Sequence, residues 1–139
     1  MIEVTGYFAA MGPLFSPGQV EAATGVRFTT KNEPGELGAR GRYRGKAIPY
    51  GRADISDNAS GAALVSPDSE LLKQALAIIE PCRIAGATSF VLHLDVKYWN
   101  QCNLEFSPSF LSAIAALGAD ITITCYEGNS ESNPGVRDG

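Results

Sequence analysis

The chain has 139 residues, of which 45 % are hydrophobic, and a formal net charge of −4. This length and composition suit one globular domain with a single core. No segment approaches the roughly 18 unbroken apolar residues of a membrane-spanning helix, which excludes a helical membrane protein.

The charge is unevenly distributed along the chain. Residues 27–52 hold seven basic and two acidic side chains, a net charge of +5, whereas the rest holds four basic and thirteen acidic ones, a net charge of −9. Such asymmetry indicates partner binding, although solubility alone also explains it. An acidic body disfavours general nucleic-acid binding and favours basic partners, because opposite charges steer encounter over long distances.

The chain start and the cysteines favour the cytoplasm. The stretch MIEVTGYFAAMG lacks the basic start of a signal peptide and is read as a strand. Cys82, Cys102 and Cys125 are odd in number and widely spaced, and no Cys-x-x-Cys pair occurs. We expect free thiols in a reducing compartment.

The first third of the chain predicts a strand, a helix and a long loop. Polar and apolar residues alternate over 2–10, which is typical of a strand with one buried face. A helix is expected over 17–24, with Ser16 as N-cap, a capping box completed by Gln19, and a glycine end. Residues 31–50, rich in glycine, proline and arginine, form a mobile basic loop with a short strand at one end.

The middle of the chain predicts two strands around a helix. A strand is expected near 52–56, and DNASG then makes a turn. The second helix is expected to begin at Ser66-Pro67 and to stop or kink at Pro81, with an apolar stripe that includes Leu76. FVLHLDVKYW, residues 90–99, is the clearest strand.

The last third repeats an earlier phrase. FSPSFLSAIAALGADITI resembles FSPGQVEAATGVRFT, and both read as an aromatic residue, a Ser-Pro helix start, a short helix, a glycine and a strand. The third helix spans 108–117 with Leu111 inward, and an alternating strand follows over 121–127. Residues 128–139 are expected to be a disordered tail.

These elements predict one α+β domain over residues 1–127. Two related β–α–β halves, or chance reuse of the same cap chemistry, would explain the repeated phrase. Because the strands alternate, about three helices should cover one face of a mixed or antiparallel sheet of four to five strands. The other face, here called the open face, should then lie in water. It carries Glu3, Thr5, Tyr7, His93, Asp95, Lys97, Trp99, Thr122, Thr124 and Tyr126.

No catalytic or metal motif stands out. His93, the only histidine, lies in a strand without a nucleophile-elbow motif. One histidine and scattered cysteines give no metal-ligand spacing, and DISDN lacks the glycine and closing glutamate of a calcium loop. No phosphate-binding motif occurs in GELGARGRYRG. We therefore expect no enzyme activity, no metal and no cofactor.

Two surfaces are candidate binding sites. Exposed tyrosine and tryptophan among charges are typical of protein interfaces, so the open face predicts partner contacts by Tyr7, His93, Asp95, Lys97, Trp99 and Tyr126. The alternative, given equal weight, is that the long loop covers these aromatic residues. The basic loop could instead grip RNA or a small ligand through Arg40, Arg42, Tyr43, Arg44 and Lys46.

The layout resembles a bacterial family, domain of unknown function 4279. NLEFSPSFLSAIAALGADITITCYE is similar to that family's ending and FSPGQVEAATGV to its opening, over roughly residues 2–127. The family often has a tryptophan at the start of the strand after the basic loop, where this chain reads YGRADIS. The family implies no enzyme activity, and its members are similar to immunity proteins of bacterial competition systems such as contact-dependent growth inhibition.

The resemblance implies a non-enzymatic immunity protein that neutralises a cognate toxin. A small acidic domain suits a basic, nuclease-type toxin, because charge complementarity and a few aromatic anchors would hold the pair. The sequence leaves open whether the open face instead forms a homodimer, and neither a membrane nor a nucleic acid is expected as partner.

Overall fold

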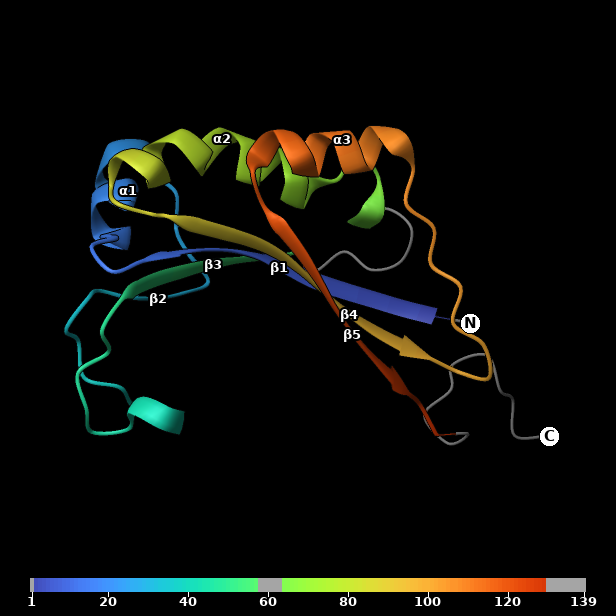
Figure 1. Ribbon diagram of the computed structural model, residues 1–139, viewed down its shortest axis with the longest axis horizontal. Coiled ribbons are helices and arrows are strands. Elements are labelled where there is room, and N and C mark those ends of the chain that lie inside the picture. Colours follow the sequence, from blue (N-terminus) through green and yellow to red (C-terminus); the bar gives the residue numbers. More distant parts are fainter. Residues whose placement is uncertain (1, 58–63, 130–139) are drawn as a thin grey trace.

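The computed structural model of the protein describes residues 2–57 and 64–129. One mixed sheet has the strand order β2-β3-β1-β4-β5. Among its adjacent strands, β4 and β5 form the one parallel pair, and the other pairs are antiparallel. Figure 1 shows three helices on one side of this sheet, which confirms the expected α+β architecture. The strands are β1 (Ile2–Gly12), β2 (Thr30–Asn32), β3 (Gly51–Asp57), β4 (Ser89–Tyr98) and β5 (Asp120–Glu127). The helices are α1 (Pro17–Thr24), α2 (Glu70–Ile84), α3 (Pro108–Leu117) and the 3-10 turn η1 (Gly41–Tyr43).

The two copies of the repeated phrase form similar but unequal units. In the second copy, α3 connects β4 to its parallel neighbour β5. In the first copy, α1 connects β1 to β2, and β3 lies between these two strands, antiparallel to both. Both copies are therefore β–α–β crossovers between parallel strands, and the first has been split by one inserted strand.

The core lies between the sheet and the helices. Val4 and Phe8 of β1 and Leu92, Leu94 and Val96 of β4 point into it, in agreement with the predicted alternation. Residues from all three helices complete this layer, among them Val20, Leu71, Leu72, Ile78, Phe110, Ile114 and Leu117.

The predicted helix starts at Ser-Pro are confirmed for α1 and α3. Ser16 Oγ accepts from Gln19 N, and Ser107 Oγ accepts from Phe110 N. Gly25 and Gly118 end these helices with φ of 76° and 69°, a backbone that favours glycine. The capping box of α1 is not closed in the expected way, because Ser16 N donates to Ala85 O at the end of α2.

The predicted start of the second helix is wrong by one turn. Ser66 O accepts from Ser69 N across Pro67, so this Ser-Pro pair opens a β-turn and not a helix. Ser69 is the N-cap instead, since its hydroxyl accepts from Leu72 N at 3.0 Å. The helix also continues through Pro81 to Ile84, so the alternative in which it stops at Pro81 is wrong.

Two helix residues predicted to face the core are exposed. Leu76 of α2 and Leu111 of α3 both lie on the outer surface of the helix layer. Phe106, just before α3, stacks on Phe110, with ring centroids 5.7 Å apart. The helical stripe is therefore narrower than the sequence pattern suggested.

The basic loop has a defined path. Gly35 N donates to Ile48 O and Ile48 N to Glu36 O, and Gly38 N donates to Lys46 O, so the two halves of the loop pair as an irregular hairpin. Glu33 Oε1 accepts from Ser16 Oγ at 2.7 Å, which ties the loop to the start of α1. The loop therefore has a framework of backbone hydrogen bonds, which the sequence pattern did not predict.

Some sequence predictions fall outside the described residues. These are most of the DNASG turn and the tail beyond Asn129. No helix within residues 2–57 and 64–129 is long and apolar enough to cross a membrane.

The buried thiol of Cys82 makes stability depend on pH. Burial raises the pKa of Cys82 from 9.0 to about 11. The folded state keeps a proton that the unfolded chain releases above pH 9, so this contribution is complete below pH 9 and is lost as pH rises towards 11. We expect a loss of about 2 kcal/mol in the free energy of unfolding by pH 11.

Urea denaturation between pH 8 and 11 measures this loss. The matched variant Cys82→Ala removes the thiol. Its free energy of unfolding should depend less steeply on pH, because only the other titrating groups still contribute. Equal slopes for the two proteins would contradict the assignment.

Candidate functional site

Strand pairing brings most of the predicted open-face residues together. Tyr7 lies opposite His93, and His93 lies opposite Thr122. Thr5, Asp95 and Thr124 form the next row across the sheet, and Glu3, Lys97 and Tyr126 form the row after that. The open face is thus a ladder of polar and aromatic side chains on β1, β4 and β5, on the side away from the helices (Figure 1).

Tyr7 is clamped at the centre of this face. Its ring centroid lies 5.0 Å from that of His93, and the guanidinium carbon of Arg52 lies 5.6 Å from the Tyr7 ring centroid. Arg52 Nη2 also lies 3.2 Å from Asp54 Oδ1, and Thr30 Oγ1 donates to Asp54 Oδ2 at 2.9 Å. These contacts cross the sheet from β2 to β4 and hold the tyrosine in one orientation.

His93 bridges a hydroxyl and a carboxylate. Its Nδ1 lies 2.6 Å from Thr122 Oγ1 and its Nε2 lies 3.1 Å from Asp95 Oδ1. The connectivity resembles that of a hydrolase triad. Acyl transfer also needs N–H donors aimed at the developing oxyanion. Backbone N–H groups of a sheet lie in its plane, whereas these side chains stand perpendicular to it, so the strands that hold Thr122 do not supply such donors above it.

Trp99 is not an exposed anchor, and the expectation that it is one is wrong. The residue is only 3 % exposed. Its ring packs on Gly128, where an added Cβ would lie 2.4 Å from Trp99 Cε2, and its Nε1 donates to Asn129 O at 2.9 Å. Lys97 Nζ lies 5.2 Å from the ring centroid. Trp99 therefore fastens the end of β5 to β4.

Tyr126 is the most accessible aromatic residue on the open face. It is 49 % exposed and lies opposite Lys97. Tyr7, His93 and Lys97 are intermediate in exposure, since each contacts a neighbour on the face. The predicted contact surface thus narrows to Tyr126 with the half-buried Tyr7 and His93 beside it.

The predicted residues of the basic loop do not all lie in one site. Arg42 stacks on Tyr43, with the guanidinium carbon 5.6 Å from the ring centroid. Arg44 and Lys46 are exposed. Arg40 and Tyr43 line a hollow of about 360 Å³ between the loop and the open side of β2 and β3.

Several residues of this hollow were not predicted as site residues. Tyr50 and Arg52 line it, together with Thr30 and Asn32 of β2. Strand alternation could have predicted part of this set. It places Arg52 on the same sheet face as Asp54 and as Met11, which lies opposite Arg52 on β1. The path of residues 33–50 that closes the hollow was not readable from a stretch of glycines and prolines.

Lys31, at the edge of the hollow, is already engaged. Its Nζ forms an ion pair and hydrogen bond with Glu21 of α1. This bond, and a second from Phe28 N, lower the pKa of the Glu21 carboxyl. Lys31 is therefore a structural cation that joins β2 to α1.

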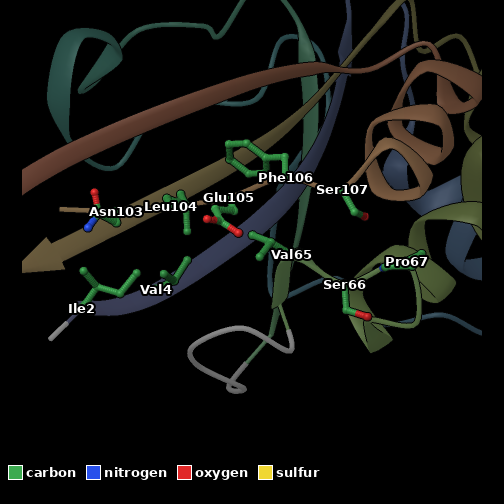
Figure 2. Close-up of a pocket in the computed structure, with 10 residues that line it drawn as sticks. All are labelled: Ile2, Val4, Val65, Ser66, Pro67, Asn103, Leu104, Glu105, Phe106 and Ser107. Atoms are coloured by element: carbon green, nitrogen blue, oxygen red, sulfur yellow. The ribbon is translucent and has the colours of Figure 1, made fainter.

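A second hollow of about 650 Å³ lies at the starts of β1, α2 and α3. Figure 2 shows Ile2 and Val4 along one side of it and Val65, Leu104 and Phe106 nearby. Ser66 and Ser107, which precede α2 and α3, lie at its other end, and Glu105 is its charged residue. Its lining is mostly apolar, in contrast to the hollow under the loop.

No cluster of three or more histidine, cysteine or acidic residues that could hold a metal ion occurs in the part of the chain described. Comparison with known proteins found no matching family model, no matching curated protein and no matching solved structure. The resemblance to the domain of unknown function 4279 therefore stays a prediction, as does every function inferred from it.

The packing of Trp99 leads to a stability prediction. Trp99→Ala should lower the free energy of unfolding by about 3 kcal/mol, because it removes a buried ring and its hydrogen bond. Gly128→Ala should also destabilise the protein, since the new methyl group would overlap the ring. Urea denaturation followed by circular dichroism measures both changes.

Tyr126→Ala, on the same face but exposed, is the control and should cost less than about 1 kcal/mol. Unchanged stability of Trp99→Ala would contradict this assignment and return Trp99 to the list of contact residues.

Proposed function

We propose that this protein is a non-enzymatic protein-binding module that docks a partner on its open face. The observation that carries the proposal is the open face of β1, β4 and β5, which no described helix covers and which presents the aromatic side chains of Tyr7, His93 and Tyr126. Clamped rings lose little conformational freedom on binding, so a larger share of the contact energy appears as affinity.

The partner we propose is a cognate toxin that the protein neutralises as an immunity protein. The resemblance to the domain of unknown function 4279 supports this identity. The charge balance supports a basic toxin, because the chain outside residues 27–52 has a net charge of −9. Opposite charges would speed encounter and select the partner, while the aromatic residues would supply the affinity.

Within this proposal, Tyr126 and Tyr7 replace Trp99 as the anchors. Tyr126 offers an exposed ring and hydroxyl near the free edge of the sheet. Tyr7 presents a half-buried ring at the centre. A large, central aromatic residue is the usual hot spot of an interface.

The test uses the candidate toxin domain encoded next to this protein's gene. Calorimetry should show tight binding, and co-expression should restore growth of the host. Tyr126→Ala should weaken binding at least about 30-fold, which corresponds to the 2 kcal/mol expected of a hot spot.

Leu111→Ala provides the matched control, because Leu111 is similarly exposed but lies on the helix layer. It should leave affinity unchanged within about threefold. Equal losses in the two variants would contradict docking on the open face, and absence of both binding and growth rescue would contradict the immunity proposal. A homodimer sealed by the open face, detected by ultracentrifugation and lost in Tyr126→Ala, would also contradict it.

A further inference from the structure

The hollow under the basic loop has the size of a small-molecule site, and its walls are held by hydrogen bonds. Its volume of about 360 Å³ lies within the range of roughly 300–1,000 Å³ that such sites occupy. Its walls are held by the backbone pairing of the loop, with Gly45 N donating to Gly38 O and Asn32 Nδ2 donating to Tyr50 O. A site whose walls are fixed binds with little loss of chain freedom.

Cationic donors line this hollow. Lys31, Arg40 and Arg52 line it together with one carboxylate, Glu36, whose Oε2 already accepts from Glu33 N. Of the three cations, Lys31 is already paired with Glu21. Arg40 has no partner among the residues that the structure describes. Arg52 is paired with Asp54 on one side, yet its side chain is 33 % exposed and a guanidinium has five N–H donors.

Arg52, which lines the hollow, also has an unsatisfied polar atom. Its Nε is buried and lacks a hydrogen-bond partner among the described residues. Leaving such groups unpaired is unfavourable. An added negative group near Arg52 would offset part of this cost by electrostatic attraction, even without contact to the buried nitrogen.

Flat and apolar surface lies beside the cations. The rings of Tyr43 and Tyr50 meet edge to face, with centroids 6.0 Å apart, and Leu37 and Ile48 also line the hollow. In the described structure the hydroxyls of both tyrosines are without a partner. Aromatic faces and edges of this kind favour a planar ring in the ligand.

We propose that this hollow binds a small molecule in which an oxyanion, a phosphate or a carboxylate, is attached to a flat ring. Arg40 and Arg52 contact the oxyanion, and Tyr43 and Tyr50 contact the ring. The site is separate from the docking surface on Tyr126, so the proposal does not rest on the partner protein.

The test is a titration of the native protein with phenyl phosphate, followed by nuclear magnetic resonance and calorimetry. We expect a dissociation constant of about 1 mM or below for a ligand of this size. Inorganic phosphate has only the oxyanion and phenol has only the ring. Both should bind at least about tenfold more weakly than phenyl phosphate. Benzoate identifies the oxyanion: the acid that binds more tightly, phenyl phosphate or benzoate, gives the preferred group.

Two arginines of the loop provide a matched pair of variants. Arg40 lines the hollow and Arg44 does not, although both are exposed and equally charged. Arg40→Ala should weaken binding about tenfold or more, and Arg44→Ala less than about threefold. Tyr50→Phe, which keeps the ring, should preserve the weaker affinity for phenol.

Four results would overturn the proposal. These are no binding of either acid, equal losses from Arg40→Ala and Arg44→Ala, inorganic phosphate binding as tightly as phenyl phosphate, and tighter binding of a single-stranded oligonucleotide that depends on both arginines. The last result would assign the loop to nucleic acid. None of them bears on docking of a protein at Tyr126, which the calorimetry with the toxin domain tests by itself.

Discussion

Strand β1 is the constraint on which the rest of the structure depends. It pairs with β3 over Gly6–Gly12 and with β4 over Ile2–Met11, so its pleat fixes the orientation of every neighbouring side chain. Phe8 enters the core and Tyr7, one residue earlier, enters the open face. A slip of one residue would exchange these two faces, burying polar groups and exposing the core. The fold and the candidate site therefore rest on the same register.

The open face compensates for its lack of helices with contacts among its own side chains. Arg52, Tyr7, His93 and Asp95 form one connected series from β3 to β4. Ala9, at the centre, is 1 % exposed although no helix covers it, because larger neighbours close over it. A face organised in this way differs from the flat, exposed apolar edge that invites aggregation.

Much of the fold could be predicted from local patterns, and the failures have particular causes. Alternation located β1 and β4, and Ser-Pro with a closing glycine located α1 and α3 to the residue. The same Ser-Pro signal failed at Ser66, where Ser69 offered a competing cap. Trp99 and Lys97 share a face by parity, but the burial of Trp99 depends on Gly128, a contact between the ends of two strands. The hollow under the loop required the path of residues 33–50, which no periodic pattern encodes.

One side chain connects the two proposed sites. Arg52 lines the hollow and also lies over the ring of Tyr7, and Tyr7 contacts His93 on the docking face. An oxyanion in the hollow would contact the same guanidinium that packs on Tyr7 and pairs with Asp54. A ligand that moves Arg52 would therefore also change the packing of Tyr7. Because coupling between two binding sites is reciprocal, a partner that fixes Tyr7 would in turn change the affinity of the hollow for its ligand. The split of the first β–α–β unit by β3 is what places Arg52 between the two sites.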